Sequence, residues 1–410
     1  MPKYKVIGLM YTRSCPLACE HCITESSPQV KERMRLWQAR DYLQAVAGFS
    51  SALGITGGEP FLYYREIAVL IREAKTLGLQ THLVTGAGWV RGEAQVRSRV
   101  EALADAGLDG LNISWDQYHE AFSTPDRAVM LARIAAESGL EVKVRTVTSA
   151  TRAKDADHAI FAGLSVDLKA TQIVRLGRAA SLPPSHFMFS DEPPKGSCGV
   201  VFSPVIEPDG SVYACCGPAK YGRKPSPLFL GNASAEPLED ILARGLTDPI
   251  LEIIYNLGPY GLHQLLKGHP FGRERFKARS AYTGICELCL DITNDPELVS
   301  ALRERLLDKD AQRLVAMSAL WRKNKSRTGA ALSVSPVTPG DAGALRGAST
   351  TPKGACASVR HASLQVRTDA DVNGSPDLSL SRGKTNQKTQ CFGENRTTKG
   401  ATNSTESGFF

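Results

Sequence analysis

Three cysteines lie within eight residues, directly after an apolar run, in the stretch CPLACEHC that spans residues 15–22. A disulfide would leave one of the three thiols unpaired, and the N-terminus carries no secretory signal that points to an oxidising compartment. Zinc would require a fourth ligand at finger-like spacing, and His21 is badly placed for that role between two of the cysteines. Three thiolates on one loop suit a [4Fe–4S] cluster whose fourth iron is left open for a substrate or cofactor.

The composition favours a cytoplasmic globular protein of one large domain or two ordinary ones. Of the 410 residues, 42% are hydrophobic and 22% are charged, and no apolar run approaches the length of a membrane span. The formal net charge is +7, but residues 325–410 hold 11 Lys and Arg against 6 Asp and Glu. Because most of the excess charge lies in this tail, we expect neither nucleic acid nor a membrane as partner.

The first 180 residues alternate β-rich runs with helical patterns. Several strand-like runs are apolar throughout, which is typical of strands that helices cover on both faces. Six βα units in succession predict an α/β fold with parallel strands, and such a sheet places its chemistry at the carboxyl ends of its strands. The cysteine stretch follows the first strand, and the motif GGEP at 57–60 follows the second. The expected strands are 4–12, 51–56, 80–85, 110–116, 140–148 and 168–177, and the expected helices are 37–48, 63–77, 90–106, 125–138 and 155–163.

The pattern changes after residue 180. The stretch CGVVFSPVIEPDGSVYACCGP at 198–218 predicts a hairpin with its turn at 208–210. Helices are expected at 237–243, 249–268 and 295–321. From residue 323 to 410 the chain is rich in Ser, Thr, Gly and Ala without sustained periodicity, so we expect a disordered tail whose Cys356 and Cys391 are incidental.

The two motifs CPLACEHC and GITGGEP resemble the cluster loop and the glycine-rich turn of radical S-adenosylmethionine (SAM) enzymes. The resemblance implies a partial (β/α)6 barrel over residues 1–180, in which Cys15, Cys19 and Cys22 hold a [4Fe–4S] cluster. The open iron of that cluster would chelate the methionine part of SAM. An electron from a low-potential donor, such as flavodoxin or ferredoxin, would then cleave SAM to a 5′-deoxyadenosyl radical that abstracts hydrogen from the substrate.

The same resemblance implies a set of SAM contacts. Many relatives end the third strand with Ser/Thr-Asn-Gly, whereas this chain has Thr85-Gly86-Ala87 and so lacks an amide side chain there. Two polar residues at the end of the fourth strand either meet the ribose or the substrate, or are ordinary polar residues at a strand end. The expected residues are His21 beside the adenine, Gly57, Gly58, Glu59 and Pro60 at the methionine end, and Ser114 and Asp116 after the fourth strand.

A second set of cysteines resembles the C-terminal extension called SPASM, in its shortened twitch form. The resemblance implies an auxiliary [4Fe–4S] cluster in a small α+β domain over residues 181–322. A tetrahedral structural zinc site is the alternative, because four thiolates satisfy either metal. The expected ligands are Cys198, Cys215, Cys286 and Cys289.

Cys216 is left over beside one of these ligands. Neighbouring residues on a strand point to opposite faces, so if Cys215 faces the auxiliary cluster, we expect Cys216 to face the mouth of the barrel. Cys216 is then either a buried small hydrophobe or a thiol that gives hydrogen to a carbon radical. The segments ISWDQYHEAF, DGSVYACCGPA and ICELC resemble radical SAM peptide epimerases of the epipeptide type. This resemblance implies L-to-D epimerisation of a ribosomally made precursor peptide, with Cys216 as the hydrogen donor. The alternatives are a twitch-type dehydrogenase of a small alcohol or cyclitol, another peptide-modifying maturase, and an iron–sulfur electron carrier, which would leave GGEP unexplained.

Overall fold

The computed structural model describes residues 4–320, apart from 153, 223–224, 270–280, 314 and 318–319. The described residues all belong to one compact unit. The tail predicted from residue 323, with Cys356 and Cys391, lies outside the described residues. Within the described ranges, no helix is both long and apolar enough to span a bilayer.

Six parallel strands form the first part of the sheet, and each pairs with the next one in chain order. The first, second and fourth strands are largely buried, as their apolar runs predict, whereas the sixth has no fully buried residue. This arrangement confirms the α/β barrel-like fold with a parallel sheet. The strands are β1 (Ile7–Thr12), β2 (Ala52–Gly57), β3 (Gln80–Thr85), β4 (Gly110–Ser114), β5 (Glu141–Thr148) and β6 (Asp167–Gln172).

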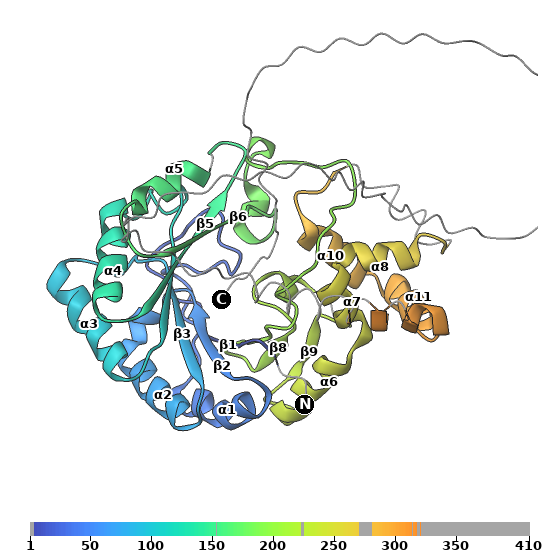
Figure 1. The fold of residues 1–410 in the computed structure, drawn as a ribbon, viewed down its shortest axis with the longest axis horizontal. Coiled ribbons are helices and arrows are strands. Elements are labelled where there is room, and N and C mark those ends of the chain that lie inside the picture. The colour runs from blue at the N-terminus through green and yellow to red at the C-terminus, as the bar shows by residue number, and fades with distance from the viewer. Residues whose placement is uncertain are drawn as a thin grey trace, which may run out of the picture. The chain divides into compact units, whose positions relative to one another are not determined.

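The helices between these strands line the outside of the curved sheet (Figure 1). In the second of them, Ile67, Leu70, Ile71 and Ala74 are buried at the i, i+3, i+4, i+7 spacing of one helix face. That face packs into the main hydrophobic core with the strands. The helices are α1 (Leu36–Phe49), α2 (Tyr64–Thr76), α3 (Glu93–Asp105), α4 (Pro125–Glu137) and α5 (Lys154–His158), with short 3-10 helices η1 (Pro60–Tyr63), η2 (Ala159–Phe161), η3 (Gly177–Ser181) and η4 (Pro184–His186).

Three further strands extend the same sheet beyond β1: β7 (Val205–Ile206), β8 (Ser211–Tyr213) and β9 (Phe229–Asn232). β7 lies parallel to β1, whereas β8 and β9 are added antiparallel. The turn between β7 and β8 includes Gly210 at φ 84°, which confirms the predicted hairpin. The proposed domain boundary at residue 180 therefore falls between two strands of one continuous sheet.

Two helix predictions in the second half are wrong in length. The expected helix 249–268 is split, because Gly258 adopts φ 74° and Pro259 begins a new helix. The helix expected over 295–321 ends at Arg305, and the carboxylate of Asp308 accepts from the Asp310 and Ala311 amides where the helix restarts. The elements are η5 (Pro218–Tyr221), α6 (Leu238–Thr247), α7 (Pro249–Leu257), α8 (Pro259–Leu266), α10 (Ile285–Thr293) and α11 (Pro296–Arg305).

Candidate metal centres

The first three cysteines lie on an irregular loop that follows β1 at the carboxyl edge of the sheet; we call residues 15–25 the cluster loop. Cys15 and Cys19 are buried and Cys22 is partly exposed. Burial, then the charge of Glu59 and then the neighbouring Cys19 and Cys22 thiols raise the pKa of Cys15. Three thiols this close would be costly as free thiolates, and a bound cation offsets that cost. The donor set therefore fits an iron–sulfur cluster.

The turn after β2 packs directly on the chain before Cys15. A Cβ atom at Gly57, where φ is 147°, would lie 2.1 Å from the Thr12 carbonyl oxygen, and one at Gly58 would lie 2.4 Å from that of Ser14. The Gly58 amide donates to the Thr12 carbonyl at 2.6 Å, and the Glu59 amide donates to the Ser14 carbonyl at 2.9 Å. Only glycine permits this close approach, so the GGEP motif fixes where the cluster loop begins.

The carboxylate of Glu59 is engaged within the chain. It is fully buried and accepts the Thr85 hydroxyl at 2.9–3.0 Å, the Gly86 amide at 3.2 Å and the Phe61 amide at 3.2 Å. Burial raises its pKa to about 7, against the opposing effect of these hydrogen bonds. Glu59 thus ties the turn after β2 to the end of β3, and Pro60 begins η1 beside it.

His21 and Asp116, both expected near SAM, are in contact with each other. The Nε2 atom of His21 lies 3.2 Å from Asp116 Oδ2, and the Nδ1 atom of His119 lies 2.9 Å from Asp116 Oδ1. The His21 ring stacks on Tyr118 with 4.8 Å between centroids. Ser114, the last residue of β4, lies beside Arg145 of β5 in the sheet register.

The Asp116 carboxylate is a buried charge between two imidazoles. Burial alone would raise its pKa, but His119 and His21 hold it below the ordinary value. Burial likewise acts to lower the pKa of His119, yet Asp116 and then Cys19 raise it well above the ordinary value. Ligand atoms of the two histidines and Asp116 lie within 4.8 Å of one another. Because both carboxylate oxygens face imidazoles, we interpret the group as a polar network behind the cluster loop.

Sequence reasoning missed His119 and Tyr118. In ISWDQYHEAF, His119 follows Asp116 by three residues, which places both side chains on one turn. This spacing could have indicated that His119 contacts Asp116. The Tyr118 hydroxyl also lies 2.9 Å from His186 Nδ1 in the segment after β6. This contact could not be predicted, because it joins residues that are 68 positions apart in the chain.

The second cysteine set converges on one small cavity. Cys198 precedes β7, Cys215 follows β8, and Cys286 and Cys289 lie three residues apart on α10. All four line the cavity, and its other lining residues are apolar. Burial is the largest cause that raises the pKa values of Cys215, Cys286 and Cys289, followed by the neighbouring thiols. The arrangement fits a single metal centre with four thiolate ligands.

Cys216 is not among the residues that line this cavity. Burial first, and then the charge of Cys198, raise its pKa to about 12. The next residue, Gly217, has φ 77°, and a Cβ atom there would lie 3.0 Å from Ile23 of the cluster loop. Cys216 therefore belongs to the segment where the two cysteine sets approach each other.

Comparison with known proteins identifies the first part of the chain. Residues 9–152 match the sequence profile of the Radical SAM superfamily. These residues form a radical SAM domain. Membership implies a [4Fe–4S] cluster and SAM as cofactors, for which the three thiols of the cluster loop are a suitable donor set.

Relatives of the radical SAM domain include proteins of several kinds. YydG of Bacillus subtilis (strain 168), named for peptide biosynthesis, is 23% identical over 307 residues, which cover 72% of this chain and 94% of YydG. The PqqA peptide cyclase of Rhizobium meliloti (strain 1021) is 34% identical over 108 residues, 25% of this chain and 26% of the cyclase. The crystal structure of Streptococcus suis SuiB bound to precursor peptide SuiA has a TM-score of 0.36 at 13% identity, covering 71% of this chain and 72% of SuiB.

Proposed function

We propose that this protein is a radical SAM peptide epimerase, in which Cys216 returns hydrogen to the Cα atom of a precursor peptide. The observation that carries the proposal is the position of Cys216. It does not line the cavity that the other four thiols share, although its charge acts on Cys215 and Cys286, and the residue beside it packs against the cluster loop. Similarity to YydG over 94% of that protein's length supports a peptide as the substrate.

In this proposal Cys15, Cys19 and Cys22 hold the first cluster, and Cys198, Cys215, Cys286 and Cys289 hold an auxiliary one. The bound cluster and SAM supply a radical that removes the hydrogen atom from a peptide Cα. Gly57 and Gly58 let the turn pack against the main chain of Thr12 and Ser14, which positions the start of the cluster loop. His21 stacks on Tyr118 and lies against Asp116, and in this proposal its ring lies beside the adenine.

Cys216 is suited to donate a hydrogen atom because burial keeps its thiol protonated. With a pKa raised to about 12, it holds its hydrogen throughout the physiological pH range. In the proposed step the S–H bond breaks, and a C–H bond forms on the opposite face of the peptide Cα. The sulfur radical that remains is restored by one electron and one proton, for which we propose a low-potential donor such as flavodoxin or ferredoxin.

The Cys216→Ser variant tests the proposal. Synthetic peptides encoded by short open reading frames beside the gene serve as substrates, with SAM and dithionite under anaerobic conditions. We expect the variant to keep both metal centres and to form 5′-deoxyadenosine. Peptide with inverted configuration should fall below detection, because an alcohol O–H bond is too strong to give up its hydrogen readily.

Cys198→Ser is the matched control, since it changes a proposed ligand instead of the donor. It should lose metal from the auxiliary site. Full epimerisation by Cys216→Ser would refute the role of this thiol. A peptide or alcohol product with two hydrogens fewer would favour the dehydrogenase alternative, and loss of auxiliary metal in Cys216→Ser would mean that Cys216 is itself a ligand.

A further inference from the structure

The carboxyl half of the cluster loop is held by residues from later in the chain. The Arg178 guanidinium donates through Nε to the Cys19 carbonyl at 2.9 Å, and the Arg178 amide donates to the Cys22 carbonyl at 3.2 Å. In addition, the Tyr221 hydroxyl donates to the Ile23 carbonyl at 2.6 Å. These hydrogen bonds all end on main-chain oxygens, so they fix the path of the loop and not a particular side chain.

The main chain at Cys22 is closely packed against Gly177 and Tyr221. Gly177 has φ 60°, and a Cβ atom there would lie 2.7 Å from the Cys22 carbonyl oxygen and 2.8 Å from the Tyr221 hydroxyl. Any larger residue would displace either the loop or the tyrosine. The segment that follows β6 and the η5 turn therefore both contact the main chain at Cys22 and Ile23.

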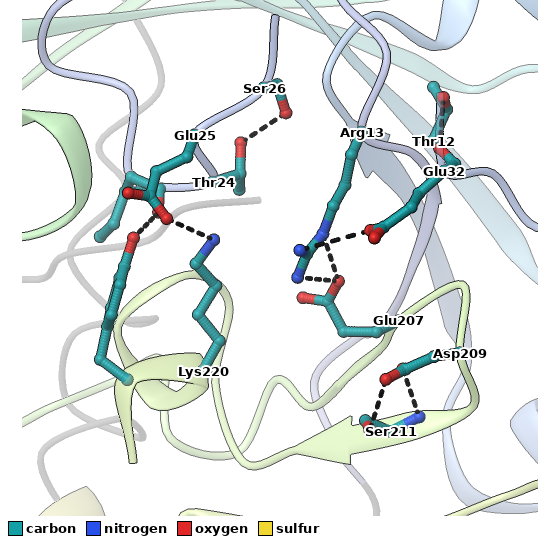
Figure 2. Close-up of polar contacts among 12 residues, drawn as sticks. Thr12, Arg13, Thr24, Glu25, Ser26, Glu32, Glu207, Asp209, Ser211 and Lys220 are labelled. Atoms are coloured by element: carbon teal, nitrogen blue, oxygen red, sulfur yellow. Dashed lines mark hydrogen bonds and ion pairs between the residues drawn. The ribbon is translucent and has the colours of Figure 1, made fainter. Parts of the chain in front are cut away.

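Ion pairs add to this contact between the first and second halves of the chain (Figure 2). Lys220 of η5, whose side chain is 8% exposed, lies 3.9 Å from Glu25 at the end of the loop. Arg13, before the loop, lies 3.0 Å from Glu207, whose side chain is 5% exposed. In each pair only one charge is buried, because Glu25 is 53% exposed and Arg13 is 28% exposed, so solvent still screens both contacts in part.

The η5 helix is linked at both ends to the segments that carry the auxiliary cysteines. It begins at Pro218, soon after Cys215. At its other end, the Tyr221 carbonyl accepts the Asn294 side-chain amide at 3.1 Å. Asn294 directly follows α10, the helix with Cys286 and Cys289. A continuous set of contacts thus joins the auxiliary thiols to the main chain next to Cys22.

We infer that Tyr221 is a positioning residue through which metal binding at the auxiliary cysteines orders the cluster loop. Metal at Cys215, Cys286 and Cys289 fixes both ends of η5, and the Tyr221 hydroxyl then holds the Ile23 carbonyl. The inference rests on the proposed auxiliary metal site, but on neither the nature of the substrate nor the reaction. It holds whether that metal is iron or zinc.

Hydrogen–deuterium exchange of the full, metal-loaded chain tests this coupling. The amides of Cys22 and Glu25, which donate to the Cys19 and Cys22 carbonyls, report on the order of the loop. Tyr221→Phe removes only the hydroxyl, and we expect exchange at residues 19–25 to rise about fivefold to tenfold, as for loss of one hydrogen bond. Tyr213→Phe in the same hairpin, where the ring packs on Phe229, is the control and should change nothing there.

A double-mutant cycle separates coupling from simple loosening. Replacing Cys286 and Cys289 together by Ala should raise exchange at residues 19–25 to a similar extent, and adding Tyr221→Phe should then have little further effect. The midpoint potential of the first cluster should also become less negative in Tyr221→Phe, because greater solvent exposure stabilises the reduced form.

Additive effects in the cycle, or unchanged exchange in Tyr221→Phe, would overturn the inference. Metal analysis of the wild-type protein distinguishes the absence of coupling from the absence of metal at the proposed auxiliary site. Metal at the second cysteine set with an unresponsive loop refutes the coupling alone, whereas absence of metal there refutes both.

Discussion

Gly57 and Gly58 show how single residues place the cluster loop, because their missing side chains let two main-chain segments touch. The sequence motif pointed to these glycines, yet the backbone contacts to Thr12 and Ser14 explain them physically. The same motif also includes Glu59, whose carboxylate is buried and accepts the Thr85 hydroxyl. Residue identity was thus predictable at this turn, while the direction of the side chain required the fold.

Gly58→Ala should weaken both the fold and the cluster. The new Cβ atom would lie 2.4 Å from the Ser14 carbonyl oxygen, so the chain before Cys15 must shift. We expect a loss of about 1–3 kcal/mol in the free energy of unfolding, measured by denaturant titration, and less iron per chain after reconstitution. Gly48→Ala in α1 is the control, since nothing lies within 4 Å of its Cβ position. Equal stability of the two variants would contradict this account of the turn.

Glu59 should make stability depend on pH. Its pKa is raised from 4.5 to about 7 in the folded protein, so the folded state binds the proton more tightly than the unfolded chain does. Stability from this group is therefore fully present below about pH 4.5 and is lost as the pH rises towards 7. Compared with Glu59→Gln, the wild type should lose about 3 kcal/mol across that range in denaturant titrations. Parallel pH profiles for the two proteins would contradict the raised pKa.

At the scale of elements, local sequence patterns predicted the strands and helices, whereas contacts between residues far apart in the chain were not predicted. The apolar runs and amphipathic helices of the first 180 residues gave strands and helices close to those observed, because both signals are local. Cys286 and Cys289 share one face of α10 through their i, i+3 spacing, which the sequence also contains. Arg178 and Tyr221 were not predicted, because their partners on the cluster loop lie 159 and 198 positions away.

Replacing Cys15, Cys19 and Cys22 together by Ala should separate the two metal centres. The auxiliary thiols line a cavity of their own, so about four irons should remain after anaerobic reconstitution and SAM cleavage should cease. Metal analysis by mass spectrometry and detection of 5′-deoxyadenosine give the two readouts. One zinc without iron in this variant would make the second centre structural, and persistent SAM cleavage would refute the assignment of the first.

At the scale of the whole molecule, one sheet contains both the strand that precedes Cys15 and the hairpin strand that precedes Cys215. β7 pairs with β1, which places the auxiliary hairpin against the strand that leads to Cys15. The sequence suggested two separate regions, because a pairing between strands some 200 residues apart leaves no local signal. This shared sheet gives a physical reason why the two cysteine sets lie near each other.

Removal of residues 326–410 should leave the chemistry unchanged. No proposed ligand or contact of the site lies in that region, and its composition is that of a segment that buries little apolar surface. Iron content and the rate of 5′-deoxyadenosine formation in the truncated protein should match those of the full chain. Failure of the truncated protein to take up either cluster would give the tail a role in the fold.

The isotope content of the product tests the central claim most directly. The wild-type enzyme is incubated with peptide substrate in heavy water, and the labile hydrogens of the product are then exchanged back in ordinary water. Because the Cys216 thiol equilibrates with solvent, epimerisation should add one deuterium at the inverted Cα and raise the mass by about one unit. A product about two mass units lighter than the substrate, or one with inverted configuration and no deuterium, would contradict hydrogen return from this thiol.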